Sequence, residues 1–286
     1  MISLPDALVD EIAERRCAII LGAGASAASK SFDGSTAPKN WTELLQAGIS
    51  KIANEDDREA AKELLDKQAY LDAAQIMFDS LEAADFNSFI NSEFKTPNFQ
   101  PSEIHKLVLR IDPKIVITTN YDSIFENYAQ QGGAVNAYNV NHYYETHLIN
   151  DLRSRERIII KAHGCVTDPQ KIILTRRQYF EARRNYPQFF SALDAIFLTH
   201  TLLFIGSGFA GDPDIELLLQ NSYISSPSEL THYAIIEEGR HKSVIDALES
   251  TYNITFYQYE KGKHGELVDA LRVLADEVDL KRSVPK

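Results

Sequence analysis

Cysteine is nearly absent from this chain of 286 residues, which contains only Cys17 and Cys165. Two cysteines cannot supply the four thiolates of a structural zinc site. Both lie in apolar, strand-like contexts, so we expect reduced and buried thiols and no metal. The sequence also lacks an apolar run long enough to cross a membrane, and its first residues lack the pattern of a signal peptide. These absences favour a cytoplasmic protein.

Basic residues are also scarce: 29 Lys and Arg stand against 41 Asp and Glu, for a formal net charge of −12. Such a surface repels nucleic acid at long range, so no direct nucleic-acid partner is predicted. One basic run opposes this balance, and its members are Lys171, Arg176, Arg177, Arg183 and Arg184. We interpret the run as a solvated helix face, with a subunit contact or an anion contact as the alternatives.

The apolar residues, 44% of the chain, are arranged in short runs that predict buried strands. The six runs are Ala18–Leu21, Ile115–Thr118, Ile158–Lys161, Leu202–Ile205, Tyr233–Ile236 and Ile254–Tyr257. Helical patterns alternate with them at Leu4–Arg16, Ser102–Arg110, Asp122–Gln130, Pro213–Gln220, His241–Thr251 and Glu266–Leu280. Strands alternating with helices predict an α/β fold, a doubly wound, Rossmann-like parallel sheet.

One connection is too long for a simple crossover and shows no strand signal. Its helical patterns are Trp41–Ile52, Asp57–Lys67, Tyr70–Leu81 and Asp85–Phe94. Because a connection of this length must carry structure of its own, we expect a helical insertion at about residues 41–95 that caps one edge of the sheet. A second helical insertion is expected at about residues 176–199. The chain is therefore predicted to be a single domain over residues 1–286 with two insertions.

Four of the predicted strands end in small or polar residues. These ends are Gly22–Ser26, Thr118–Asp122, Lys161–Gly164 and Gly206–Phe209. Ligands of open α/β sheets bind beyond the carboxyl ends of the strands, so the four ends predict one shared site.

The glycine loop, read alone, has two interpretations. Glycines after a buried strand let a ligand approach the backbone, and a following helix offers its free N–H groups to a phosphate. A Gly-x-Gly turn also serves simply as a tight corner. The dinucleotide fingerprint of dehydrogenases is not met, because Ala27 occupies the third glycine position. Glu43 lies at the distance of the ribose-binding acid, but in a helical pattern. A dehydrogenase is therefore disfavoured.

The four ends together, Gly-Ala-Gly-Ala-Ser, Thr-Asn-Tyr-Asp, Lys-Ala-His-Gly and Gly-Ser-Gly-Phe, resemble the sirtuin (SIR2) fold. More closely, they resemble the bacterial SIR2-like proteins that cleave NAD in antiphage defence. The resemblance covers roughly Ala13 to Glu260. It implies an NAD glycohydrolase that releases nicotinamide and ADP-ribose as the effector of an abortive-infection system.

The resemblance also implies roles for individual residues. The loop that would contact the pyrophosphate of NAD consists of Gly22, Ala23, Gly24, Ala25 and Ser26. Asn120 would hold the nicotinamide-side ribose and the reacting water, and His163 would be the general base. Asp122 would help to organise the nicotinamide-ribose pocket, with Thr119 beside it. Gly206 and Ser207 would line the adenosine side.

These residue types suit the chemistry. Nicotinamide leaves from a cationic state, and the transition state is oxocarbenium-like, as in glycoside cleavage. The reaction needs a positioned water and a modest base rather than a metal. A histidine that titrates near neutrality can be that base. An amide side chain can both donate and accept hydrogen bonds, so Asn120 can orient a hydroxyl and a water together.

Two departures from the deacylase sirtuins matter. This chain cannot build their four-cysteine zinc module, and Thr119 and Tyr121 replace the Gln and Ile of their asparagine motif. A protein-lysine deacylase therefore remains the alternative, and a non-enzymatic subunit that senses NAD or ADP-ribose is another. His163 could instead be a satisfied strand-end histidine. Asn120 could be the N-cap of a helix that begins near Asp122, a role compatible with catalysis.

The partners are inferred from the resemblance. An unrestrained NAD hydrolase would kill its own host, so we expect activity to be controlled by homo-oligomerisation or by a separate trigger subunit. A HerA-type ATPase or a short Argonaute are examples of such triggers. Neither a membrane nor a direct nucleic-acid partner is expected.

Overall fold

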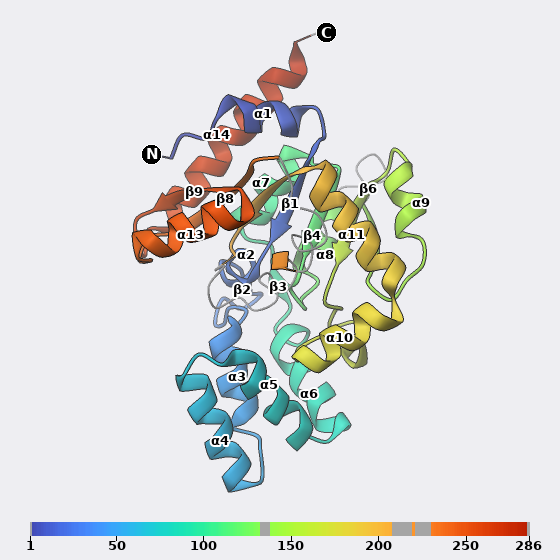
Figure 1. Ribbon diagram of the computed structural model, residues 1–286, viewed down its shortest axis with the longest axis vertical. Helices are drawn as coiled ribbons and strands as arrows, with labels where there is room; N and C mark the ends of the chain where they lie inside the picture. The colour runs from blue at the N-terminus through green and yellow to red at the C-terminus, as the bar shows by residue number, and fades with distance from the viewer. Residues whose placement is uncertain (1, 132–137, 208–218, 221–229, 285–286) are drawn as a thin grey trace.

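A seven-stranded sheet forms the centre of the computed structural model, which describes residues 2–131, 138–207, 219–220 and 230–284 (Figure 1). Its strands are β1 (Cys17–Leu21), β4 (Ile115–Thr118), β5 (Tyr138–His142), β6 (Arg157–Lys161), β7 (Thr201–Ile205), β8 (His232–Glu237) and β9 (Ile254–Tyr259). They lie in the order β5-β6-β4-β1-β7-β8-β9, and every neighbouring pair is parallel. The predicted α/β fold with a parallel sheet is confirmed.

The five inner strands of the sheet, β1, β4, β6, β7 and β8, are buried on both faces, which is why they are apolar without alternation. In β1, Ile19 packs into the core beneath α1 (Asp6–Ala13), α7 (Glu103–Ile111) and α14 (His264–Ser283). Its neighbour Ile20 packs into the opposite core, under α9 (Leu148–Arg153), α11 (Pro187–Thr199) and α13 (Lys242–Tyr252). Consecutive residues of one strand thus serve two separate cores, as the two-residue period of a strand requires.

All six predicted strands are present, but β5 was not predicted. It is an edge strand, and its burial alternates from the buried Tyr138 to the exposed Asn139. The two asparagines at positions 139 and 141 interrupt the apolar run that identifies the other strands. A small antiparallel pair, β2 (Lys30–Ser31) with β3 (Phe99–Gln100), was also missed, because two residues leave no pattern.

The four helices predicted between residues 41 and 95 are present. They are α3 (Trp41–Ile49), α4 (Glu55–Asp66), α5 (Tyr70–Ser80) and α6 (Ala83–Phe94), called the helical lobe below. They share an apolar core that includes Leu45, Met77 and Phe89. Figure 1 shows the helical lobe beyond the carboxyl ends of the strands, not along a side edge. Its core extends to Tyr121, in the connection that follows β4. The helical lobe therefore faces the predicted site.

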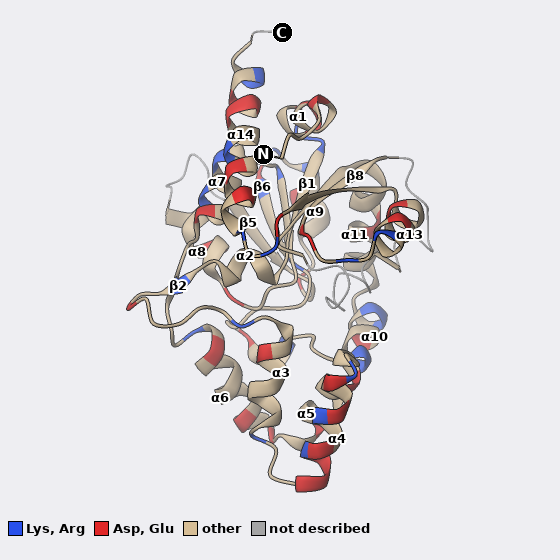
Figure 2. Cartoon of the chain, turned by 90° about the vertical axis from the view of Figure 1, so that its left-hand side faces the viewer, with Lys and Arg blue, Asp and Glu red and all other residues tan. Residues whose placement is uncertain are grey.

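The second helical stretch contains α10 (Arg176–Asn185) followed by α11. Arg176, Arg177 and Arg184 on α10 are exposed, in agreement with a solvated helix face. Arg177 pairs with Asp79 of α5 at 2.6 Å. Figure 2 shows basic residues, in blue, along α10 and acidic residues, in red, along α4. The predicted helix Pro213–Gln220 lies almost wholly outside the described residues.

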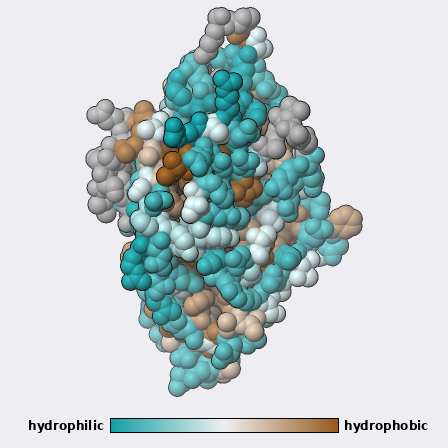
Figure 3. Space-filling view, turned by 90° about the vertical axis from the view of Figure 1, so that its right-hand side faces the viewer, coloured by the Kyte–Doolittle hydropathy of each residue, from teal (hydrophilic) through white to brown (hydrophobic). Residues whose placement is uncertain are grey.

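The surface over α9, α10 and α11 is mainly hydrophilic, with hydrophobic side chains in small separate areas (Figure 3). Ile149, Phe180 and Leu198 are the large apolar side chains exposed on these three helices. Scattered apolar residues of this kind are normal on a protein surface. Nowhere in the described ranges is there a helix with the length and apolarity needed to span a bilayer.

Candidate active site

The connections that follow β1, β4 and β7 meet at the carboxyl end of the sheet. β1 lies between β4 and β7, where the chain reverses its direction across the sheet. Open α/β sheets form their ligand crevice at this kind of position. The connection after β1 begins the short helix α2 (Ala23–Ala27), and the connection after β4 carries Asn120. The topology thus brings the glycine loop and Asn120 together.

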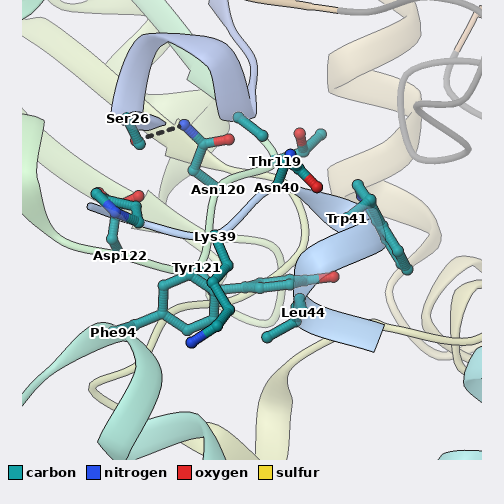
Figure 4. A pocket seen from close by; sticks show the side chains of 12 residues that line it. Ser26, Lys39, Asn40, Trp41, Leu44, Phe94, Thr119, Asn120, Tyr121 and Asp122 are labelled. Carbon is teal, nitrogen blue, oxygen red and sulfur yellow. Dashed lines mark hydrogen bonds between the residues drawn. The ribbon is translucent and has the colours of Figure 1, made fainter. Parts of the chain in front are cut away.

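The side chain of Asn120 is fixed against the glycine loop. Its Nδ2 donates to the carbonyl oxygen of Gly22 at 3.0 Å and to Oγ of Ser26 at 2.9 Å (Figure 4). A carbonyl oxygen only accepts, so the amide nitrogen must be the atom that faces Gly22. Oδ1 is consequently the atom of Asn120 that can accept from a ligand hydroxyl or a water. Figure 4 shows Oδ1 turned away from Ser26, toward Asn40 and Thr119.

The glycines of the loop are explained by close packing against the end of β7. A Cβ on Gly24 would lie 2.8 Å from the carbonyl oxygen of Gly206, and one on Gly22 would lie 2.7 Å from the same atom. Gly206 itself has a φ of +68°, and a Cβ there would lie 2.2 Å from the backbone nitrogen of Ala25. The tight-corner interpretation is therefore correct for these positions, and it is compatible with ligand binding.

Several N–H groups of the loop bond within the fold. Gly22 N donates to the carbonyl of Ile205, and Gly24 N donates to the carbonyl of Gly206 at 2.8 Å. Ala25 N donates to the carbonyl of Gly22. A phosphate cradle made of all five loop amides is thus not available in this conformation. Ala23 and Ser26 line one cavity and Ala23 and Gly24 line a second, so these three are the loop residues placed to touch a ligand.

Two cavities adjoin these residues. The inner cavity is lined by Ala23, Ser26, Pro38, Lys39, Asn40, Trp41, Leu44, Phe94, Thr119, Asn120, Tyr121 and Asp122, and its volume is about 30 Å³. That volume holds about one water molecule. Helical-lobe side chains form one wall and the connection after β4 forms the other (Figure 4). A larger ligand group enters only if these walls separate.

The outer cavity is large enough for part of a nucleotide, at about 520 Å³. It is lined on the sheet side by Gly24, Gly206, Ser207, Glu237, Glu238, Arg240, Lys261 and His264, among others. Ala23, Asn40 and Trp41 line both cavities. The N-terminal turn of α3 is therefore a wall that the two cavities share. Gly208 and Phe209, the rest of the fourth strand end, lie outside the described residues.

Asp122 lines the inner cavity and also starts a helix. It is 3% exposed, and its Oδ1 accepts a hydrogen bond from Ile124 N at 3.0 Å, at the beginning of α8 (Ile124–Gln131). The predicted N-cap role of Asn120 is wrong, because the helix begins later and Asp122 supplies the acceptor. Asn120 instead anchors its own backbone nitrogen on Oγ1 of Thr118 at 3.0 Å.

His163 is not brought to either cavity. It follows β6, its side chain is fully buried, and its ring packs edge-on against Tyr179 at 5.8 Å between centroids. Neither the inner nor the outer cavity has His163 in its lining. The structure thus gathers Ser26, Thr119, Asn120 and Asp122, while His163 stays behind them in the core.

Sequence reasoning missed the contribution of the helical lobe, namely Asn40, Trp41, Leu44 and Phe94. One signal was present: Asn40 and Glu43 form a reciprocal capping box at the start of α3. That motif places the beginning of the helix, although not its position above the sheet. No group of three or more potential metal ligands occurs among residues that the structure describes.

Comparison with known proteins finds a family model and three relatives that match this chain. A family model described as a SIR2-like domain matches residues 114–257. "NAD(+) hydrolase ThsA" of Acinetobacter baumannii (strain 532279) is 24% identical over 255 residues, which are 89% of this chain and 49% of that protein. The protein of the same name from Bacillus cereus (strain MSX-D12) is 25% identical over 245 residues, 85% of this chain and 47% of that one.

A third relative, "Defense-associated sirtuin 2" of Bacillus subtilis, is 29% identical over 157 residues, 52% of this chain and 14% of that protein. The chain spans about half the length of the two hydrolases that it matches. The family model covers half of the chain, including the strand ends that carry Asn120 and His163. Together with the parallel sheet, this match shows that the chain belongs to the family of SIR2-like domains.

Proposed function

We propose that this protein hydrolyses the bond between nicotinamide and ribose in NAD, releasing nicotinamide and ADP-ribose. The observation that carries the proposal is the locked amide of Asn120. Its nitrogen is held by Gly22 and Ser26, so its oxygen is presented beside two adjoining cavities. The relatives named as NAD(+) hydrolases support the same reaction.

The two cavities suit the two ends of the substrate. In this proposal the adenosine half of NAD occupies the outer cavity, where Arg240 and Lys261 favour the anionic pyrophosphate and Glu238 can accept from ribose hydroxyls. The nicotinamide end enters the inner cavity, beside Asn120 and Asp122. Trp41, which lines both, lies at the junction near the bond that breaks.

The reaction needs no strong acid, because nicotinamide leaves as a neutral molecule from a cationic glycoside. Oδ1 of Asn120 accepts a hydrogen bond from a ribose hydroxyl or from the attacking water, and so fixes their orientation. The carbon–nitrogen bond breaks with its electron pair going to nicotinamide. Water forms the new bond to ribose and loses its proton to a base, the role that we assign to His163.

The described conformation supports a resting state. The inner cavity is too small for a nicotinamide ring, and the base that we assign is fully buried. We therefore propose that the walls of the inner cavity separate on activation. Activation would come from assembly of several copies or from contact with a trigger subunit such as a HerA-type ATPase or a short Argonaute. The relative named as a defence-associated sirtuin supports a role as an antiphage effector.

The direct test is to incubate the purified protein with NAD and to measure nicotinamide and ADP-ribose by chromatography, at low and high protein concentration. We expect Asn120→Ala to lower kcat/KM by about two orders of magnitude, because the positioned acceptor is lost. Asn127→Ala, on the exposed surface of α8, is the matched control and should retain activity. A fully active Asn120→Ala variant would contradict the proposed site.

A second candidate is a protein that binds the nucleotide without turnover, and the burial of His163 favours it. Calorimetric binding of ADP-ribose with no nicotinamide release at any assembly state would support this sensing role. NAD consumption that starts only on addition of an acyl-lysine peptide would instead support a deacylase. One time course of NAD, with and without such a peptide, separates the three functions.

A further inference from the structure

Lys161 is a buried cation directly beneath the candidate site. It is the last residue of β6, and its side chain is 0% exposed. Its Nζ lies 2.6 Å from Oε1 of Glu126 on α8 and donates to the backbone carbonyl of Asp122 at 2.5 Å. Glu126 is nearly as buried, at 7%. One ammonium thus joins a strand, a helix and the end of the Asn120 connection.

The ammonium of Lys161 is held in its charged form. Burial lowers its pKa, but the neighbouring acidic groups, first Glu126 and then Cys165 and Asp122, together outweigh burial and carry the pKa above its usual value. The same charge acts on the thiol of Cys165. Burial raises the pKa of this thiol, but the ammonium of Lys161 and a hydrogen bond with His142 bring that pKa below its usual value. Lys161 is therefore a fixed charge rather than a titrating base.

Stability alone does not explain this pair. Taking an ammonium and a carboxylate out of water is costly, and well-packed apolar residues of similar size often stabilise a fold equally well. The apolar residues that surround the sheet could fill this position. The directed bond to Asp122, which an apolar side chain cannot make, is what distinguishes lysine here.

The carbonyl that Lys161 holds belongs to the short connection between β4 and α8. Thr118 anchors the start of this connection, through its Oγ1 and Asn120 N, and Lys161 anchors its end two residues after Asn120. Between the two anchors, Tyr121 donates its hydroxyl to the carbonyl of Ile173 at 2.8 Å. Asn120 therefore faces the glycine loop from a backbone that is fixed on both sides.

We infer that Lys161 is a positioning residue for the proposed hydrolysis: by holding the carbonyl of Asp122, it fixes Asn120 against Gly22 and Ser26. Glu126 has a complementary part. Burial raises the pKa of its carboxyl group, and the ammonium of Lys161, 2.6 Å away, opposes that shift. As a carboxylate it neutralises the ammonium, so that the anchor adds no net positive charge beneath a site where an oxocarbenium-like transition state develops. This inference rests on the proposed function.

The kinetic test replaces the pair by apolar side chains. The double variant Lys161→Met/Glu126→Leu removes both charges together, which avoids the uncompensated carboxylate that Lys161→Met alone would leave. We expect a melting temperature close to that of the wild type and at least a tenfold lower kcat, with little change in KM. A double variant that is as stable and as active as the wild type would overturn the inference.

Arg157→Met provides the matched control. Arg157 is the first residue of the same strand, where it binds the carboxylate of Asp112 at the end of the sheet remote from the site. Its loss should lower the melting temperature and leave kcat unchanged. A fall in kcat that merely follows lost stability would appear equally in Arg157→Met, and such a result would contradict a positioning role.

A second readout does not depend on turnover. Backbone hydrogen exchange in a peptide spanning residues 119–124 should be at least tenfold faster in the double variant, while exchange in β1 and β7 stays at the wild-type rate. Unchanged exchange in that peptide would overturn the anchor. If the wild type fails to hydrolyse NAD, the proposed function fails, and this measurement still decides whether Lys161 holds the connection.

Discussion

At the scale of residues, the polar side chains of the site differ in how many of their hydrogen-bonding atoms are already bonded within the fold. The amide nitrogen of Asn120 donates its hydrogen bonds to Gly22 and Ser26, so only the amide oxygen remains for a ligand. Oδ1 of Asp122 accepts a hydrogen bond from the backbone nitrogen of Ile124, at the start of α8. Asn and Asp side chains can make several kinds of hydrogen bond. Here, the bonds that they already make within the fold limit which of their atoms can bind a ligand.

Two buried histidines predict a dependence of stability on pH. Burial lowers the pKa of His105 from 6.5 to about 4, although Asp122 opposes the shift, and burial lowers the pKa of His232 to about 4. Both rings accept a hydrogen bond through Nδ1, from Ser102 N and Leu202 N respectively, and therefore fold in the neutral form.

Because each folded pKa lies below the unfolded value, the unfolded chain takes up protons first as the pH falls. Stability should be fully present above about pH 6.5 and decline toward pH 4, by up to about 3 kcal/mol for each ring. Urea unfolding at pH 7.5 and at pH 5 measures the decline. His105→Gln should make it smaller, and an identical decline in that variant would contradict the assignment.

At the scale of elements, the apolar runs predicted the central strands because both faces of those strands are covered. The edge strand β5 escaped prediction because its asparagines break the pattern. Four strand ends were predicted to share one site. Topology brings the ends of β1, β4 and β7 together, whereas His163, after β6, lies buried outside both cavities. What the sequence could not predict is the position of α3, which depends on the packing of the helical lobe against Tyr121 and its neighbours.

The caps of α3 and α4 allow a test of that position. Asn40 accepts from Glu43 N, and Asn54 accepts from Asp57 N at 3.1 Å in the same way. Replacing either by Ala should cost about 1 kcal/mol of stability, because one helix cap is lost. Only Asn40→Ala should also weaken ADP-ribose binding, measured by calorimetry, because Asn40 lines both cavities. Equal affinity in the two variants would exclude α3 from the binding site.

At the scale of the whole molecule, the site lies where two apolar cores meet. Trp41 packs against the core of the sheet and also against the core of the helical lobe. The inner cavity is formed between the helical lobe and the connection after β4, so its volume depends on how these two parts are placed. The opening proposed above therefore requires the helical lobe to move, rather than one side chain.

Trp41 gives this motion a direct signal, because it is the only tryptophan in the chain. Binding of ADP-ribose should change the intensity or the wavelength of its fluorescence, since the indole ring lines both cavities. The titration should saturate at the same concentration as calorimetric binding. Emission that stays constant while calorimetry shows saturation would mean that the nucleotide binds elsewhere.

Because Trp41 packs against both cores, the helical lobe and the candidate site are mechanically connected. The far end of the helical lobe, α4, is exposed and acidic, and it has no part in lining either cavity. α4 shares the core of the helical lobe with α3, and the first turn of α3 lines both cavities. Under the proposed function, a molecule that binds α4 acts on the candidate site from a distance, without touching any residue that lines the two cavities.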